Sequence, residues 1–177
     1  GWLASPAQGG GPVLYIGTHV LDQVLWSVGK PVERVFAEVN RPQADGVEAD
    51  ALATLRFAGG AVAQVVTSQR LGGRYGWLDL FGTAGRMHVE WESHTLTIQS
   101  SVVDAYRDLT EVHVPVEAGL PRMDVNTRVS VVTHFYIRAW AGALAEFCAA
   151  IRDGRDPSIT GEDGVRVLEV TDAIFES

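Results

Sequence analysis

The feature that most constrains the fold is a series of short strand-like segments through the middle of the chain. Apolar and polar residues alternate in two of them, 34–39 and 51–57, a pattern typical of half-buried β-strands. The segments span residues 34–39, 51–57, 61–67, 77–81, 87–91, 95–99 and 111–114. Short turns such as Ala58-Gly59-Gly60 join consecutive segments. Because parallel strands need long crossovers, such turns predict a large, mostly antiparallel sheet.

Apolar residues take a helical period in three other regions, at about 18–28, 135–151 and 162–175. Gly29-Lys30-Pro31 is expected to end the first of these helices, and residues 153–157 the second. In the last helix the inward-facing candidates are Val165, Leu168, Val170 and Ile174. The combination predicts an α+β fold in which helices pack on one face of the sheet.

The opposite face of the sheet is expected to be open and mixed in polarity. Its expected side chains are Thr54, Arg56, Gln64, Val66, Trp77, Asp79 and Phe81. A mixed face that carries aromatic residues can pair with another subunit, so we expect a homo-oligomer, a dimer or tetramer, through this face.

The length, charge and cysteine content of the chain limit the kinds of protein that it can be. The 177 residues are expected to form a single domain over residues 1–177, and the net charge of −8, without a basic stripe, argues against a nucleic-acid partner. No apolar run is long enough to span a membrane, so no membrane partner is expected. The one cysteine, Cys148, lies in an apolar helical run and is expected to be a buried thiol, which fits a cytoplasmic protein. The chain begins with Gly1 and not with methionine, and we interpret it as part of a longer polypeptide.

The stretch from Gly9 to Asp22 carries the strongest functional signal. Three consecutive glycines let the backbone pass close to a ligand or to another segment. A short apolar segment, strand-like or a turn, is expected next, and a helix begins near Gly17 to His19. His19 and Asp22 are three residues apart, so they lie on one face of that helix. A histidine in the first turn can present its imidazole to a cleft and exchange a proton there.

This stretch resembles the start of the C-terminal, substrate-side domain of the Gfo/Idh/MocA family of NAD(P)-dependent sugar and inositol oxidoreductases. The family pattern is a glycine run followed by Gly-x-His-x-x-Asp, matched here by Gly17, His19 and Asp22. Residues 78–89 resemble the family's hairpin around Gly-Thr-x-Gly, and residues 156–177 resemble its C-terminal signature. The three segments occur in the family's order and span nearly the whole chain.

The resemblance implies site residues. His19 would exchange the proton of the substrate hydroxyl, and Asp22 would act with it or orient it; a capping histidine and a salt-bridged aspartate are the structural alternatives. Tyr15 stands where the family usually has an aspartate, and it either contacts the substrate or serves only packing. Thr18 and His134 complete the predicted substrate contacts, although His134 also suits a solvated helix N-terminus.

The family binds its nicotinamide cofactor on an N-terminal Rossmann domain that also supplies a catalytic lysine. The Gly-x-Gly-x-x-Gly fingerprint of such a domain is absent from this sequence, and Gly9-Gly10-Gly11 does not fit it, because no strand precedes it. The resemblance therefore implies that NAD or NADP binds mainly to a domain outside residues 1–177, and that this chain alone binds no cofactor. No histidines or cysteines have metal-ligand spacing, so no metal site is expected.

The predicted function is the substrate-binding and oligomerisation domain of an NAD(P)-dependent oxidoreductase acting on a hydroxyl of a sugar, an inositol or a related polyol. The isolated domain is expected to be inactive. The alternative is a non-catalytic ligand-binding or dimerisation module that kept the fold and lost the chemistry. Tyr15 in place of the family aspartate supports that alternative, because a phenol is a poor base near neutral pH.

Overall fold

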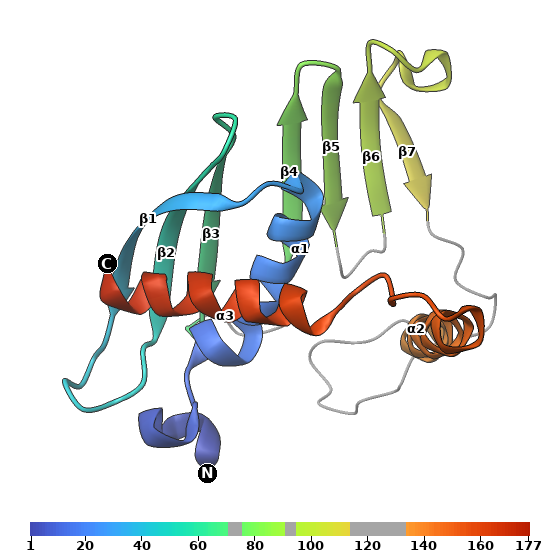
Figure 1. Cartoon of the computed structure of the whole chain (residues 1–177). Coiled ribbons are helices and arrows are strands. Elements are labelled where there is room, and N and C mark those ends of the chain that lie inside the picture. Colours follow the sequence, from blue (N-terminus) through green and yellow to red (C-terminus); the bar gives the residue numbers. More distant parts are fainter. Residues whose placement is uncertain (71–75, 91–94, 114–133) are drawn as a thin grey trace. The chain divides into compact units, whose positions relative to one another are not determined.

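The computed structural model describes residues 1–70, 76–90, 95–113 and 134–177. The chain divides into two compact units, one formed by residues 1–71 and 155–177 and the other by residues 72–154 (Figure 1). Each unit contains one antiparallel sheet, of three strands in the first unit and four in the second. The predicted α+β class and the antiparallel pairing are confirmed, and the described strands are distributed between two sheets.

The sheet of the first unit consists of β1 (Val32–Asn40), β2 (Asp50–Phe57) and β3 (Val62–Ser68), in the order β1-β2-β3. Burial alternates along β2, as its sequence predicts. The turn between β2 and β3 contains Gly59 and Gly60, whose φ angles of 85° and 96° suit glycine.

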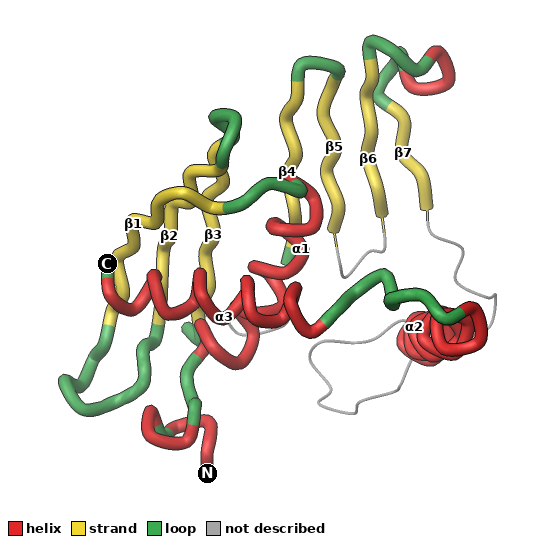
Figure 2. Tube along the Cα trace, viewed as in Figure 1, coloured by secondary structure: helices red, strands yellow, loops and turns green. Residues whose placement is uncertain are grey.

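Two helices, α1 (Thr18–Val28) and α3 (Gly161–Glu176), pack on this sheet (Figure 2). Helix α3 contacts both β1 and α1, and the Ser177 hydroxyl accepts a 2.8 Å hydrogen bond from the Ala37 N–H of β1. Helix α1 ends at Gly29, which is left-handed, as predicted. The core between helices and sheet includes Leu21, Val24, Ala53, Leu55, Phe57, Val65, Val170 and Ile174.

The inward face of α3 differs in part from the prediction. Val170 and Ile174 are buried as predicted, whereas Val165 and Leu168 are about half exposed, at 54% and 50%. Val167 and Thr171 are buried in their place. The Thr171 hydroxyl donates to the Val167 carbonyl at 2.8 Å, so this polar side chain enters the core with its hydrogen bond made.

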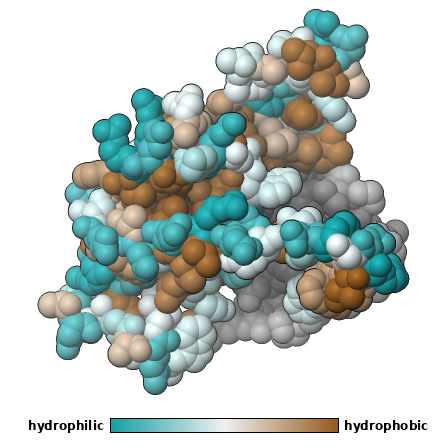
Figure 3. All heavy atoms as spheres, in the orientation of Figure 1, coloured by the Kyte–Doolittle hydropathy of each residue, from teal (hydrophilic) through white to brown (hydrophobic). Residues whose placement is uncertain are grey.

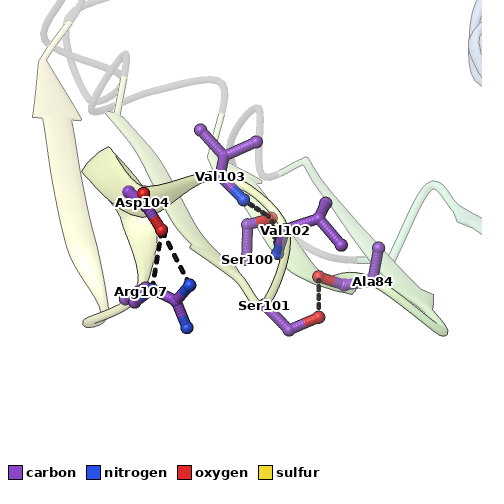
Figure 4. Close-up of polar contacts among 7 residues, drawn as sticks. All are labelled: Ala84, Ser100, Ser101, Val102, Val103, Asp104 and Arg107. Carbon is purple, nitrogen blue, oxygen red and sulfur yellow. Dashed lines mark hydrogen bonds and ion pairs between the residues drawn. The ribbon is translucent and has the colours of Figure 1, made fainter.

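The second unit contains β4 (Trp77–Gly82), β5 (Gly85–Glu90), β6 (Thr95–Ser100) and β7 (Thr110–His113), paired in sequence order. The predicted hairpin between β4 and β5 is present. Its turn is tied to the end of β6, because the Ser101 N–H and hydroxyl both donate to the Ala84 carbonyl (Figure 4). Ser100 is buried and accepts hydrogen bonds from the N–H groups of Val102 and Val103.

Helix α2 (His134–Asp153) also belongs to the second unit and matches the predicted helix. The large apolar side chains Trp140, Leu144, Phe147 and Ile151, which the helical period places on one face of α2, are exposed. Cys148 is exposed as well, so the expectation of a buried thiol is wrong. Figure 3 shows hydrophobic residues at the surface of the protein among hydrophilic ones.

The open sheet faces agree with the prediction in each unit. In the first unit Arg56, Gln64 and Val66 are exposed and Thr54 is half-buried. In the second unit Trp77, Asp79 and Phe81 are exposed.

The loop predicted over residues 117–128 lies outside the described residues. In the described part of the chain, no helix combines the length and the hydropathy needed to cross a bilayer.

Candidate active site

The segment before α1 is helical and not strand-like. Residues Val13–Gly17 form a π-helix, labelled η3, that runs directly into α1, so the strand-like alternative for this segment is wrong. Two 3-10 turns, η1 (Trp2–Ala4) and η2 (Pro6–Gln8), precede the glycines. Gly11 has a φ of 107° and turns the chain into this π-helix. Short π-helical segments are rare and often occur at functional sites.

Tyr15, His19 and Asp22 follow one another at spacings of four and three residues along this helical run. Tyr15 and His19 are exposed and Asp22 is half-buried, whereas Leu21 and Val24 on the other side of α1 are buried. The ring of Tyr15 packs edge-on against Trp2, with the centroids 5.6 Å apart. The three side chains make no hydrogen bond or ion pair with any described residue, and His19 and Asp22 are not hydrogen-bonded to each other.

The two remaining predicted contacts are placed differently. The hydroxyl of Thr18 donates to the Leu14 carbonyl at 3.1 Å, so only its lone pairs remain to accept a hydrogen bond from a ligand. His134 is the first residue of α2, in the second unit, and its side chain is outside the described part. The structure therefore brings Tyr15, Thr18, His19 and Asp22 together on one helical run.

A groove of about 560 Å³ lies beside the C-terminal half of α1 in the first unit. Among the predicted site residues it includes Asp22, and it is also lined by the start of β1 and by residues of α3 between Asp163 and Ala173. Its lining mixes charged and apolar side chains, among them Leu25, Trp26, Lys30, Arg34, Ile159 and Arg166.

Glu48, which no sequence pattern indicated, is a carboxylate at the start of this helical run. Glu48 precedes β2 and is only 3% exposed. Its Oε1 accepts a 2.8 Å hydrogen bond from the Val13 N–H, 35 residues away in the sequence. No local pattern could have indicated this contact, because it joins the start of the π-helix to the loop before β2, and only the fold brings these two segments together.

The same contact tests whether the glycine turn could hold a dinucleotide. A pyrophosphate at a helix N-terminus needs free backbone N–H groups and a positive local field. Here the Val13 N–H is already bound to Glu48, and a buried carboxylate repels a phosphate. The residues of this turn therefore do not fit a dinucleotide. Among the described side chains, no group of three or more histidines, cysteines or acids could hold a metal ion.

Several solved dehydrogenases have a similar fold. Levoglucosan dehydrogenase in complex with NADH and levoglucosan is 25% identical, with a TM-score of 0.74 over 100% of this chain and 51% of that chain. UDP-N-acetylglucosamine 3-dehydrogenase from Acidithiobacillus ferrooxidans is 19% identical, with a TM-score of 0.71 over 93% and 46%. An oxidoreductase domain protein from Kribbella flavida is 18% identical, with a TM-score of 0.72 over 96% and 49%. No curated protein matches the sequence.

A sequence model of the GFO/IDH/MocA C-terminal domain matches residues 1–88. The chain belongs to the Gfo/Idh/MocA family. The matched residues include the whole helical run with Tyr15, His19 and Asp22, and also Glu48. This Gfo/Idh/MocA chain spans about half the length of the solved structures that it resembles.

Proposed function

We propose that this chain is the substrate-side domain of an NAD(P)-dependent dehydrogenase acting on a secondary hydroxyl of a sugar, an inositol or a related polyol. The observation that carries the proposal is the exposed face formed by Tyr15, His19 and Asp22. Their polar groups are free among the described residues and stand on a helix whose other side is buried. Levoglucosan dehydrogenase, which has a similar fold, was also solved with NADH and L-sorbose, and this supports a sugar or polyol as substrate.

In this proposal the chain handles the hydroxyl proton of the substrate. The imidazole of His19 takes that proton as the carbinol carbon is oxidised and returns it in the reverse direction. Asp22 orients the imidazole or accepts a second substrate hydroxyl, and the phenol of Tyr15 donates a hydrogen bond to the substrate. NAD or NADP is assigned to a separate nucleotide-binding domain of the natural polypeptide, since the glycine turn does not fit a dinucleotide.

The proposal includes self-association through the open face of the β1-β2-β3 sheet. Phe36, Leu52 and Val66 are exposed on this face at 61%, 47% and 65%. Leu52 and Val66 are cross-strand partners, so their side chains lie next to each other. An apolar cluster on a flat sheet supports contact with a second copy of the chain. The proposed location is the cytoplasm, which suits a chain whose one cysteine is a free thiol.

A second candidate is a non-catalytic module with the same fold. Tyr15 supports it, because this residue replaces the acid that usually acts beside the histidine in the family. In that case the exposed face would bind a ligand or a partner without transferring a proton.

An assay of the full-length protein with NAD or NADP separates the two candidates. It follows the absorbance of the nicotinamide across a panel of sugars and inositols. The dehydrogenase proposal predicts cofactor reduction with at least one polyol. Tight cofactor binding without turnover on any member of the panel would favour the non-catalytic module.

A further inference from the structure

Glu48 is a buried carboxylate for which the proposed chemistry has no direct use. It is 3% exposed, and among the described residues its hydrogen-bond donor is the Val13 N–H. A carboxylate removed from water is costly unless its oxygens are hydrogen-bonded. The segment that Glu48 contacts explains why a carboxylate is buried just before β2.

That segment is the turn from Gly11 to Gly17, which leads into the helix of His19. Val13 is the first residue of the π-helix, and the first N–H groups of a helix have no partner within the helix itself. Glu48 provides this missing acceptor from another part of the fold. The N-terminal end of this segment is held by the Gly11 N–H, which donates to the Leu3 carbonyl at 3.1 Å. Within the segment, the Tyr15 N–H donates to the Gly11 carbonyl at 3.0 Å.

The end of the same turn rests on β3. A Cβ on Gly17 would lie 3.3 Å from the Thr67 methyl carbon, so strand and turn are in close contact there. Thr67 pairs with Ala51 of β2, and Glu48 lies just before that strand. Neighbouring strands of one sheet thus hold the turn at its start through Glu48 and at its end through Thr67.

We infer that Glu48 is a positioning residue for the face formed by Tyr15, His19 and Asp22. Its carboxylate fixes the first turn of the helical run and thereby sets where the Tyr15 phenol and the His19 imidazole point. The inference rests on the proposed function for its catalytic meaning. The positioning itself is measurable without turnover.

Nuclear magnetic resonance of the chain tests the inference with Glu48→Ala and Glu48→Gln. The amide variant keeps an acceptor oxygen but loses the charge, and hydrogen bonds to charged acceptors are about twice as strong. Glu38→Gln, at an exposed position of β1, is the matched control for the change of charge. The readouts are hydrogen exchange at the Val13 amide, exchange at Leu55 in the core, and the ring resonances of Tyr15 and His19.

In Glu48→Ala we expect exchange at Val13 to accelerate by about tenfold or more, with exchange at Leu55 unchanged and both ring resonances shifted. Glu48→Gln is expected to show a smaller shift in the same direction, and it decides the question if Glu48→Ala does not fold. Ring resonances that stay at their wild-type positions in the folded variants would overturn the inference. An equal acceleration at Val13 and Leu55 would also overturn it, because it would indicate only a loss of global stability.

These outcomes remain distinct from a failure of the proposed function. If the wild-type polypeptide shows no turnover while the ring resonances shift as expected, the proposed function fails and the positioning role stands. If turnover depends on His19 while the ring resonances in the Glu48 variants do not shift, the proposed function stands and the positioning role fails.

Discussion

The carboxylate of Glu48 fills the space where a side chain on Gly11 would begin. A Cβ on Gly11 would lie 2.6 Å from the Cδ of Glu48, which is closer than such atoms approach each other. The φ of Gly11 is 107°, a conformation that other residues rarely adopt. Gly11 therefore allows Glu48 to reach the Val13 N–H, and the glycine run and the buried acid act as one structural unit.

Gly11→Ala should destabilise the chain by about 3 kcal/mol, because it adds backbone strain and a clash with a buried carboxylate. The control is Gly29→Ala, since Gly29 also has a positive φ of 62° but has open space around its Cα. That change should cost about 1 kcal/mol. Urea unfolding measures both free energies, and equal costs for the two variants would contradict the proposed fit between Gly11 and Glu48.

Replacing either of two buried threonines by valine should change the free energy of unfolding, in opposite directions for the two positions. The Thr67 hydroxyl is buried and has no hydrogen-bond partner among the described residues, whereas the Thr171 hydroxyl donates to Val167. Thr67→Val should raise the free energy of unfolding by about 1 kcal/mol, and Thr171→Val should lower it by about the same amount. A loss of stability in Thr67→Val, measured by urea unfolding, would mean that its hydroxyl has a partner.

The N-terminus of α3 should make stability depend on pH in acid. The Thr160 backbone N–H, and after it the Thr160 hydroxyl, hold the pKa of Asp163 below its ordinary value of 3.8. A carboxyl whose pKa is depressed on folding contributes stability above its unfolded pKa and loses this contribution as pH falls through the folded pKa.

Asp163→Asn should therefore be less stable than wild type at pH 7, and the difference should shrink as the pH falls below 3.8. Thermal unfolding across this pH range is the measurement. Asp172→Asn, at an exposed position of the same helix, is the control. A difference between Asp163→Asn and wild type that stays constant with pH would contradict a role for the ionised carboxylate.

The open sheet face should control self-association. Val66→Lys places a charge beside Leu52 in the exposed apolar cluster and should shift an oligomer towards monomer. Leu168→Lys makes a comparable change on the exposed side of α3 and should leave the mass unchanged. Light scattering measures the mass of both variants. Dissociation of Leu168→Lys together with an intact Val66→Lys oligomer would place the interface elsewhere.

The strands and helix ends were predictable because their signals are local. Alternation identified β2 from residues 51–57, and Gly29 marked the end of α1, because glycine readily takes the left-handed conformation that ends this helix. The inward face of α3 was predicted only in part. A search for apolar residues selects Leu168 and misses Thr171, whose hydroxyl is satisfied by the backbone of its own helix.

The part of the candidate site that lies on one helix was predictable from the sequence. The spacing of three residues between His19 and Asp22 is enough to place both on one helical face. Glu48 was not predictable, because its contact with Val13 spans 35 residues and depends on how β2 is placed against the glycine turn. The π-helical form of Val13–Gly17 also escaped prediction, since a short apolar stretch fits several conformations.

The most direct test of the role proposed for His19 compares two histidine variants of the full-length protein, His19→Gln and His88→Gln. His88 lies on β5 in the second unit and pairs with Asp79 at 2.7 Å, so it controls for the loss of an imidazole. With a polyol that the wild type oxidises, we expect kcat to fall by about 10²–10⁴-fold in His19→Gln and to stay near wild type in His88→Gln. A wild-type kcat in His19→Gln would contradict the assignment of His19 as the group that exchanges the hydroxyl proton.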